Sequence, residues 1–337
     1  MLGSPPTSFL QRASGAKKII VLDLGFLGDS VHLLPALWEI RRHFPQAELH
    51  TLSASVGAAL LHLAPCVTRP WAFPLSPQSP PWWRHWDILR DLRSQRFDLA
   101  FNFSGADRTI FLTALTGARL RLAHQGGRKH FWNRWLIPTW IPPQDRHLPV
   151  YEQRRQVLAA CGLLLQPPRF DLLVPEAAAL WAKSHIPPRA VHLSINASAA
   201  VKEWPLPLWI ALAKTLLPAR PDLCLVATAG PQPREAARLR QFQAALPHPR
   251  LTCYEALPIA QLAALLQRCR LHIGADSGVW HLAFALGLPT LIVARQYDGL
   301  QEWRHQGSRH TCLTAPSLDS LPSEAMLQAA LRQLSAL

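Results

Sequence analysis

Residues 17–37 begin with a short apolar run and pass through a glycine-bounded turn into a helical pattern. The run over 19–24 is rich in β-branched residues, which is typical of a strand buried in a parallel sheet. Gly25 and Gly28 bound the turn, and leucines follow at helical spacing. The sequence therefore predicts a strand–turn–helix unit. Open α/β sheets bind their ligands at the carboxyl ends of such strands.

Asp29 stands at the mouth of this turn and allows two interpretations. Aspartate is a preferred cap at helix N-termini, where it is worth about 1 kcal/mol over alanine. It is also a candidate general base, held ionised by the positive end of the helix dipole. Pro35 falls inside the helical pattern and removes a backbone hydrogen bond. We therefore expect either a distorted first turn or a later start of the regular helix.

Residues 274–293 repeat this layout of strand, small polar turn, helix, glycine and strand. Asp276, Ser277 and Gly278 would lie at a helix N-terminus, where free backbone N–H groups and the helix dipole favour phosphate. His281 follows one helical turn later, on the same side. The alternative is that Asp276 or Ser277 is an ordinary cap and that His281 is a hydrogen-bonded core residue.

Strand and helix patterns alternate along both halves of the chain, which indicates α/β domains with parallel sheets. A length of 337 residues suggests two domains. The segment 166–174 contains two prolines and is the expected boundary. The resulting parts are a disordered tail, an N-terminal domain, a C-terminal domain and a final amphipathic helix, at residues 1–16, 17–168, 169–320 and 321–337. Residues 65–81 are rich in proline and are expected to form a loop.

The formal net charge of +14 predicts an anionic partner, for which nucleic acid, phospholipid headgroups and phosphorylated sugars are all candidates. The excess of Arg over Lys fits the codon bias of a GC-rich genome equally well. No apolar run reaches the roughly 20 residues of a membrane-spanning helix, and no signal peptide is visible, so we expect a cytoplasmic protein. The six cysteines are widely spaced, which favours reduced thiols over a zinc site or disulfides.

The segment 117–147 interrupts the alternation and mixes basic residues with aromatic ones. Its cations include Arg128, Lys129 and Arg134, against the single acid Asp145. Such a loop can bind sugar phosphates, a membrane surface or single-stranded nucleic acid. The alternative is a structural excursion whose tryptophans pack against the domain.

Three blocks of the sequence together resemble glycosyltransferase family 9, bacterial heptosyltransferases that move heptose from ADP-heptose onto the inner core of lipopolysaccharide. The blocks are residues 25–29 with 35–37, residues 194–205 with Trp209 and Leu212, and residues 276–290. Their order and spacing match the family. The resemblance implies an α/β fold of the GT-B architecture. In it, two Rossmann-like domains with parallel sheets face each other across a cleft, and the C-terminal domain binds the nucleotide sugar.

The resemblance also implies roles for individual residues. Asp29 matches the family's general base, and Lys202 matches the lysine that contacts the donor phosphates. The other donor-binding positions correspond to Asn196, Ala197, Glu235, Asp276, Ser277, Gly278 and His281. Among these, Glu235 is a weaker match for an acidic group near the ribose.

The expected chemistry is direct displacement with inversion, in which Asp29 takes the acceptor proton while Lys202 and the helix start at Ser277 stabilise the leaving diphosphate. No Asp-x-Asp pair occurs in the sequence, so we expect neither a metal nor another cofactor. The implied partners are an ADP-sugar donor, an acidic phosphorylated glycolipid acceptor and the cytoplasmic face of the inner membrane, without nucleic acid. Arg128, Lys129 and Arg134 would bind the acceptor.

Several other functions stay open. A dehydrogenase would need a G-x-G-x-x-G turn, whereas the opening turn here is G-x-x-G-D. A nucleic-acid-binding protein would account for the charge, but no such motif is visible. A catalytically silent scaffold would not need Asp29, Lys202 and His281. Residues 294–298 depart from the family's usual turn, so a glycosyltransferase that uses another nucleotide sugar, or an acceptor other than lipopolysaccharide, is the nearest alternative.

Overall fold

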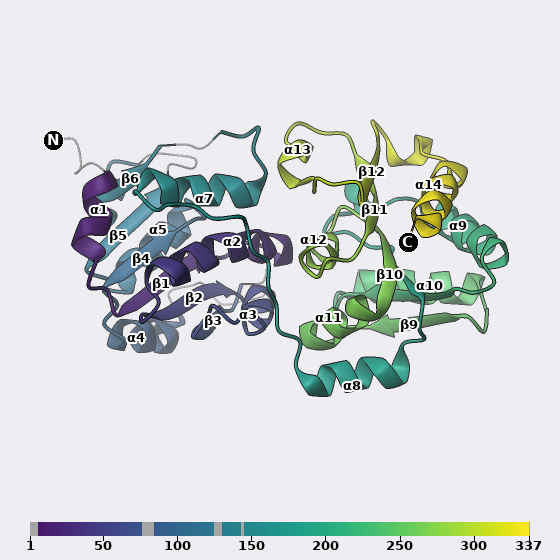
Figure 1. Cartoon of the computed structure of the whole chain (residues 1–337), viewed down its shortest axis with the longest axis horizontal. Coiled ribbons are helices and arrows are strands. Elements are labelled where there is room, and N and C mark those ends of the chain that lie inside the picture. Colours follow the sequence, from purple (N-terminus) through teal and green to yellow (C-terminus); the bar gives the residue numbers. More distant parts are fainter. Residues whose placement is uncertain (1–5, 76–83, 125–129, 143–144, 337) are drawn as a thin grey trace. The chain divides into compact units, whose positions relative to one another are not determined.

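The computed structural model describes residues 6–75, 84–124, 130–142 and 145–336 (Figure 1). The chain divides into two compact units, Met1–Leu173 and Val174–Leu337. Each unit contains one six-stranded sheet in which every neighbouring pair of strands is parallel. Within the described ranges, no helix combines the length and the apolar character that a membrane crossing requires.

The sheet of the first unit has the strand order β3-β2-β1-β4-β5-β6. Its strands are β1 (Lys18–Asp23), β2 (Glu48–Ala54), β3 (Arg69–Phe73), β4 (Leu99–Asn102), β5 (Leu120–His124) and β6 (Thr139–Ile141). Its helices are α1 (Pro6–Ala13), α2 (Leu27–His43), α3 (Ser55–Leu61), α4 (Trp86–Ser94), α5 (Asp107–Leu115), α6 (Asn133–Leu136) and α7 (Val150–Ala160). The first strand therefore lies at the centre, and the order reverses between β1 and β4.

Strand β1 is buried on both faces, as its apolar sequence predicts. Ile19 and Val21 belong to the hydrophobic cluster that includes Leu33 and Leu37 of α2. Ile20 and Leu22 point into a second cluster that α4 and α5 cover from the other side. The two polar residues of this strand therefore fall at its ends, Lys18 at the start and Asp23 at the carboxyl end, where the chain leaves the sheet.

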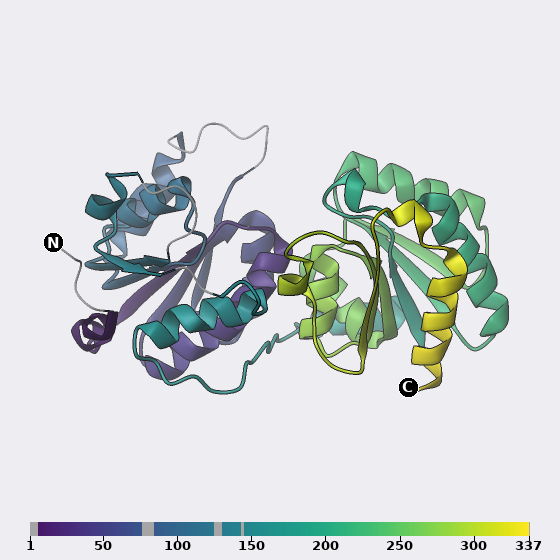
Figure 2. The ribbon, with the colours of Figure 1, turned by 90° about the horizontal axis from the view of Figure 1, so that it is seen from above.

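The sheet of the second unit has the order β12-β11-β10-β7-β8-β9, which reverses between β7 and β10. Its strands are β7 (Ala190–Ser194), β8 (Cys224–Ala229), β9 (Leu251–Glu255), β10 (Cys269–Ala275), β11 (Thr290–Arg295) and β12 (His310–Ala315). Its helices are α8 (Glu176–His185), α9 (Leu206–Ala219), α10 (Pro233–Ala245), α11 (Ile259–Arg268), α12 (Gly278–Ala285), α13 (Leu300–Trp303) and α14 (Ser323–Ser335). Figure 2 shows the final helix α14, in yellow, beside the strands of this unit, where Met326 and Ala330 enter the core.

The expectation of a disordered tail is wrong for residues 6–13, which form α1, while residues 1–5 lie outside the described residues. Phe9 is fully buried in the core of the first unit, with its ring centroid 6.0 Å from that of Phe101. The expectation of a later helix start near Pro35 is also wrong, since α2 begins at Leu27 and continues through this proline. Apolar packing of the helix outweighs the local cost of the proline.

The proline-rich stretch 65–81 was expected to be a loop, but it contains strand β3. The basic, aromatic segment 117–147 contains strand β6 and the short helix α6. Both β3 and β6 are edge strands of the first sheet. Proline is tolerated at a sheet edge, so Pro70 does not prevent β3 from pairing with β2.

Two histidines lie side by side in the centre of the second sheet. His192 on β7 and His272 on β10 are register partners, and their Nδ1 atoms are 2.8 Å apart. His192 Nε2 is also within 2.8 Å of the Thr228 hydroxyl. Burial lowers the pKa of His192 to about 3, and burial together with His192 lowers the pKa of His272. The native core therefore holds both rings neutral.

This pair predicts loss of stability in mild acid. Below about pH 6.5 the unfolded chain protonates these rings while the folded chain cannot, so the free energy of unfolding falls as pH drops towards 3. We expect a loss of about 1 kcal/mol per pH unit from His192 alone between pH 6 and pH 4. Urea unfolding of His192→Asn should show a shallower dependence on pH, whereas His62→Asn, at an exposed position, should keep the wild-type slope. Equal slopes in all three proteins would contradict the assignment.

Candidate active site

Two carboxylates stabilise the turn after β1 by accepting hydrogen bonds from its main-chain N–H groups. Asp23 accepts a hydrogen bond from the N–H of Gly25 at 2.9 Å, and Asp29 Oδ2 accepts one from the N–H of Phe26 at 2.9 Å. Phe26 is the N-cap of α2, so Asp29, the third residue of the helix, occupies the acidic position of a capping box. A Cβ on residue 25 would lie 2.4 Å from Asp29 Cγ, which explains the glycine. One oxygen of Asp29 thus caps the helix.

Arg154, on α7, joins both carboxylates. Its Nη2 atom lies 2.5 Å from Asp23 Oδ2 and 3.4 Å from Asp29 Oδ1. Its Nη1 atom donates to the main-chain oxygen of Asp29. The side chains of Asp23 and Arg154 are 3% and 9% exposed, whereas that of Asp29 is 24% exposed. Asp29 is therefore the member of this cluster that a substrate can reach.

Burial raises the pKa of Asp29, and it outweighs the opposing effect of Arg154. The charge of Asp23 raises this pKa further, while the N–H of Phe26 lowers it. The sequence suggested a carboxylate kept ionised by the helix N-terminus, but the surrounding protein shifts it towards the protonated form. A raised pKa brings a carboxylate closer to the range in which a general base works well at neutral pH.

In the second unit, Lys202 and Asp276 form an ion pair. The ammonium Nζ lies 2.8 Å from Asp276 Oδ2, and the hydroxyl of Tyr297 donates to the same oxygen at 3.3 Å. Lys202 Nζ also lies 5.4 Å from the centre of the Tyr297 ring. The side chain of Asp276 is 7% exposed and that of Lys202 is 35% exposed. The lysine is therefore anchored at one side and open to a ligand at the other.

A helix starts at the position predicted from residues 276–278. Ser277 is the N-cap of α12, and its side chain makes no capping hydrogen bond within the described structure. Ser277 Oγ and Asn196 Oδ1 are both buried without a hydrogen-bond partner among the described residues. They follow β10 and β7, the neighbouring strands at which the order of the second sheet reverses. Such an edge offers free N–H groups and polar atoms to a phosphate.

The remaining predicted donor residues have partners inside the second unit. The N–H of Ala197 donates to Glu203 Oε1 at 3.3 Å, and Glu235 Oε2 accepts from the N–H of Gly230 at 2.8 Å. Burial raises the pKa of Glu235. The Nδ1 atom of His281 lies 2.9 Å from an imidazole nitrogen of His305, and burial lowers the pKa of His281 to about 4. His281 is therefore a neutral, buried histidine.

Of the three predicted acceptor residues, the structure describes only the main chain of Arg134. Arg128 and Lys129 lie outside the described residues, and Arg134 lies in α6 with its side chain outside the described part. Around them, the side chains of Phe131 and Trp135 are 78% and 83% exposed. The alternative interpretation, in which the tryptophans of this segment pack against the domain, therefore fails for Trp135.

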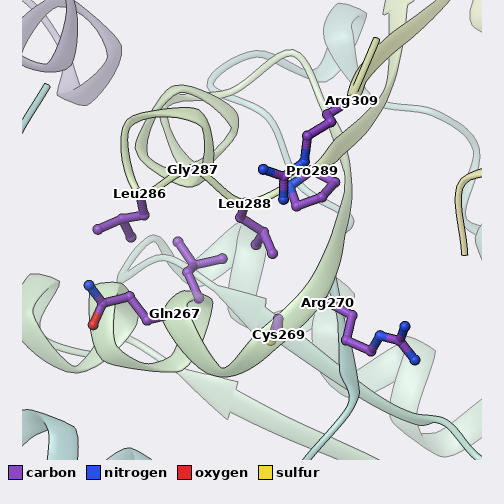
Figure 3. Close-up of a pocket in the computed structure, with 9 residues that line it drawn as sticks. Gln267, Cys269, Arg270, Leu286, Gly287, Leu288, Pro289 and Arg309 are labelled. Carbon is purple, nitrogen blue, oxygen red and sulfur yellow. The ribbon is translucent and has the colours of Figure 1, made fainter. Parts of the chain in front are cut away.

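A pocket of about 250 Å³ lies at the opposite end of the second sheet's strands from Lys202 and Ser277. Figure 3 shows Leu286, Gly287 and Leu288 at the end of α12 on one side of it, with Arg270 and Arg309 nearby. These residues stand at the amino ends of the strands, where α11 and α12 end. Helix C-termini carry partial negative charge, which disfavours a phosphate. This pocket is therefore not the donor site that Lys202 and Ser277 suggest.

Four residues of these clusters were not singled out from the sequence: Asp23, Arg154, Tyr297 and His305. Arg154 is 125 residues from its partner Asp29, and Tyr297 is 21 residues from Asp276. No local pattern encodes such pairings. The available signals were an acid at the end of the apolar strand and the departure of residues 294–298 from the family pattern.

Comparison with known proteins identifies the family of this chain. The sequence profile of glycosyltransferase family 9 (heptosyltransferase) matches residues 85–316, more than half of the chain. The lipopolysaccharide core heptosyltransferase OpsX of Haemophilus influenzae is 21% identical over 277 residues, which cover 82% of this chain and 78% of OpsX.

Two solved structures share the fold. The family 9 glycosyltransferase of Veillonella parvula superposes with a TM-score of 0.81 at 17% identity, covering 95% of this chain and 98% of that one. The Escherichia coli heptosyltransferase WaaC, solved with ADP-2-deoxy-2-fluoro heptose, gives 0.74 at 18% identity and covers 94% and 99%. The predicted GT-B fold, with two Rossmann-like α/β domains built on parallel sheets, is confirmed. The chain therefore belongs to glycosyltransferase family 9, the heptosyltransferases, and is a glycosyltransferase.

Proposed function

We propose that this protein transfers heptose from ADP-heptose to an inner-core lipopolysaccharide acceptor, with inversion and without a metal. The observation that carries the proposal is Asp29, a partly exposed carboxylate of raised pKa at the carboxyl end of a central strand. The relatives support the substrates, because OpsX is named for the lipopolysaccharide core and WaaC was solved with an ADP-heptose analogue.

In the proposed reaction, Asp29 takes the proton of the acceptor hydroxyl as its oxygen attacks the anomeric carbon. The bond from that carbon to the donor phosphate breaks, and ADP leaves with the electron pair. Lys202 and the N–H groups at the start of α12 stabilise the negative charge on the departing diphosphate. Asp276 and Tyr297 orient the lysine, while Ser277 and Asn196 offer further polar contacts.

Other donor-side roles follow the family resemblance. Gly278 lets the chain approach the diphosphate closely, Ala197 lines the same pocket and Glu235 lies near the ribose. His281 shapes the floor of the site as a neutral ring.

The acceptor side of the proposal rests on composition. An acidic phosphorylated glycolipid would bind Arg128, Lys129 and Arg134, and the net charge of +14 also suits the anionic cytoplasmic face of the inner membrane. The exposed Phe131 and Trp135 suit the apolar part of a glycolipid or the membrane interface.

The nearest alternative keeps the reaction but changes the sugar or the acceptor. Tyr297 favours it, since this residue contacts Asp276 and lies in the segment 294–298 that departs from the family pattern. Calorimetric titration with ADP-, UDP- and GDP-sugars separates these possibilities. Binding of ADP-heptose well above the others supports the proposal, and preference for a UDP- or GDP-sugar replaces the proposed donor.

Replacing the proposed base should separate chemistry from binding. Asp29→Asn keeps an oxygen for the N–H of Phe26 but cannot take a proton, so we expect heptose transfer to fall by about 10²–10⁴-fold. Affinity for ADP-heptose should stay close to that of the wild type. Asp87→Asn, in the first turn of α4, is the matched control and should transfer normally. Full turnover by Asp29→Asn would exclude this residue as the base.

Replacing the proposed diphosphate ligand should weaken donor binding. Lys202→Ala removes a charge-assisted contact that is worth about 1.5–3 kcal/mol, so we expect the Kd for ADP-heptose to rise by about 10–100-fold in calorimetry. Lys214→Ala, at an exposed position of α9, is the control. An unchanged Kd in Lys202→Ala would rule out the assigned role of the lysine.

A further inference from the structure

Arg154 is a buried cation placed between two carboxylates. It projects from α7 and reaches the carboxyl end of β1 and the first turn of α2 at once. Its two terminal nitrogens have different tasks: Nη2 lies 2.5 Å from Asp23 Oδ2 and 3.4 Å from Asp29 Oδ1, while Nη1 donates to the main-chain oxygen of Asp29. The planar guanidinium fixes these directions relative to one another.

The adjacent residue shows what a purely structural arginine does on the same helix. The side chain of Arg155 is 5% exposed and pairs with Glu39 at 3.2 Å and with Glu152 at 2.5 Å. It also donates to the main-chain oxygen of Gln166, and within the described structure it forms neither a hydrogen bond nor an ion pair with Asp29. The two arginines are thus similarly buried and paired, but only Arg154 reaches the carboxylate proposed as the base.

The contacts divide unequally between the acids. Asp23 is shielded from solvent, because its side chain is 3% exposed, forms an ion pair with Arg154 through Oδ2 and accepts the N–H of Gly25 through Oδ1. Asp29 keeps the longer contact and the exposed surface. A base needs this arrangement, since a carboxylate bound tightly to arginine on both oxygens would be a poor proton acceptor.

We propose that Arg154, anchored by Asp23, is a positioning residue that directs the Asp29 carboxylate towards the acceptor and balances its charge. The inference rests on the proposed role of Asp29 as the base. Asp23 keeps the guanidinium from closing fully on Asp29, and the Nη1 contact fixes the main chain at the first turn of α2.

The charges of Arg154 and Asp23 have opposite effects on the pKa of Asp29, which makes the proposed role testable. Arg154 lowers the pKa of Asp29 and Asp23 raises it, on top of the larger effect of burial. The N–H of Phe26 also lowers it. Among the described residues, His124 at the end of β5 also interacts with Arg154 and Asp23, and burial lowers its pKa, so it adds no charge near neutrality. Removing Arg154 and removing Asp23 should therefore shift the pKa of Asp29 in opposite directions.

The test compares pH profiles of kcat/KM for heptose transfer in the full-length protein. In Arg154→Gln we expect the acid limb to move up by about one pH unit, and in Asp23→Asn we expect it to move down. Arg154→Lys keeps the charge but loses the fork, so its acid limb should stay near that of the wild type while kcat falls. Arg155→Gln is the matched control, with lower thermal stability and an unshifted acid limb.

A second readout does not need turnover. In protein labelled with ¹³C-aspartate, the Asp29 carboxyl signal is identified by its loss in Asp29→Asn and is titrated in each variant. Opposite shifts in Arg154→Gln and Asp23→Asn support the inference, even if the wild type fails to transfer heptose and the proposed function is wrong. If Arg154→Gln does not fold, Asp23→Asn and Arg154→Lys still decide. Shifts in the same direction, or none, overturn the inference.

Discussion

Both units depend on the burial of their central parallel strands on two faces. A strand such as β1, with Ile19–Leu22 fully buried, has no room for a polar side chain along its length. In the first unit the candidate acids therefore lie where β1 ends, whereas the central strands of the second unit also bury His192 and His272, whose Nδ1 atoms are 2.8 Å apart. In both units the reversal of strand order leaves a gap between the connections at the strand ends. In the first unit Asp23 ends β1 and Asp29 follows it, and in the second Asn196 and Ser277 follow β7 and β10.

This constraint explains which parts of the fold the sequence could predict. Inner strands rich in apolar and β-branched residues, such as β1 and β11, stand out, and both were expected. The strands that were missed, β3, β6 and β12, all lie at sheet edges. An edge strand pairs with a neighbour on one side only, so proline, charged residues and short length are tolerated there. The sequence pattern that predicts a strand is therefore weaker at a sheet edge.

The site divides in a similar way. The candidate residues at helix starts could be predicted from the sequence, because Asp29, Asp276 and Ser277 each follow a predicted strand. Their partners Arg154 and Tyr297 could not be predicted, since these residues lie far from Asp29 and Asp276 in the sequence. The sequence could therefore nominate an ionisable group, while its pKa and its orientation depend on packing that only the folded structure supplies.

The same local arrangement, an acid in the first turn of a helix that accepts a backbone N–H, occurs in both units. Asp29 and Glu235 are each the third residue of a helix that follows a strand, and each accepts a hydrogen bond from a preceding backbone N–H. In both cases a glycine makes room: a Cβ at residue 25 or residue 230 would lie 2.4 Å or 2.3 Å from the acid. Burial raises the pKa of both acids. What distinguishes Asp29 is the buried Asp23–Arg154 pair beside it, which can hold a reactive carboxylate in one orientation. A helix-start acid that accepts a backbone N–H explains the turn at both places, and the added ion pair is the feature that points to chemistry.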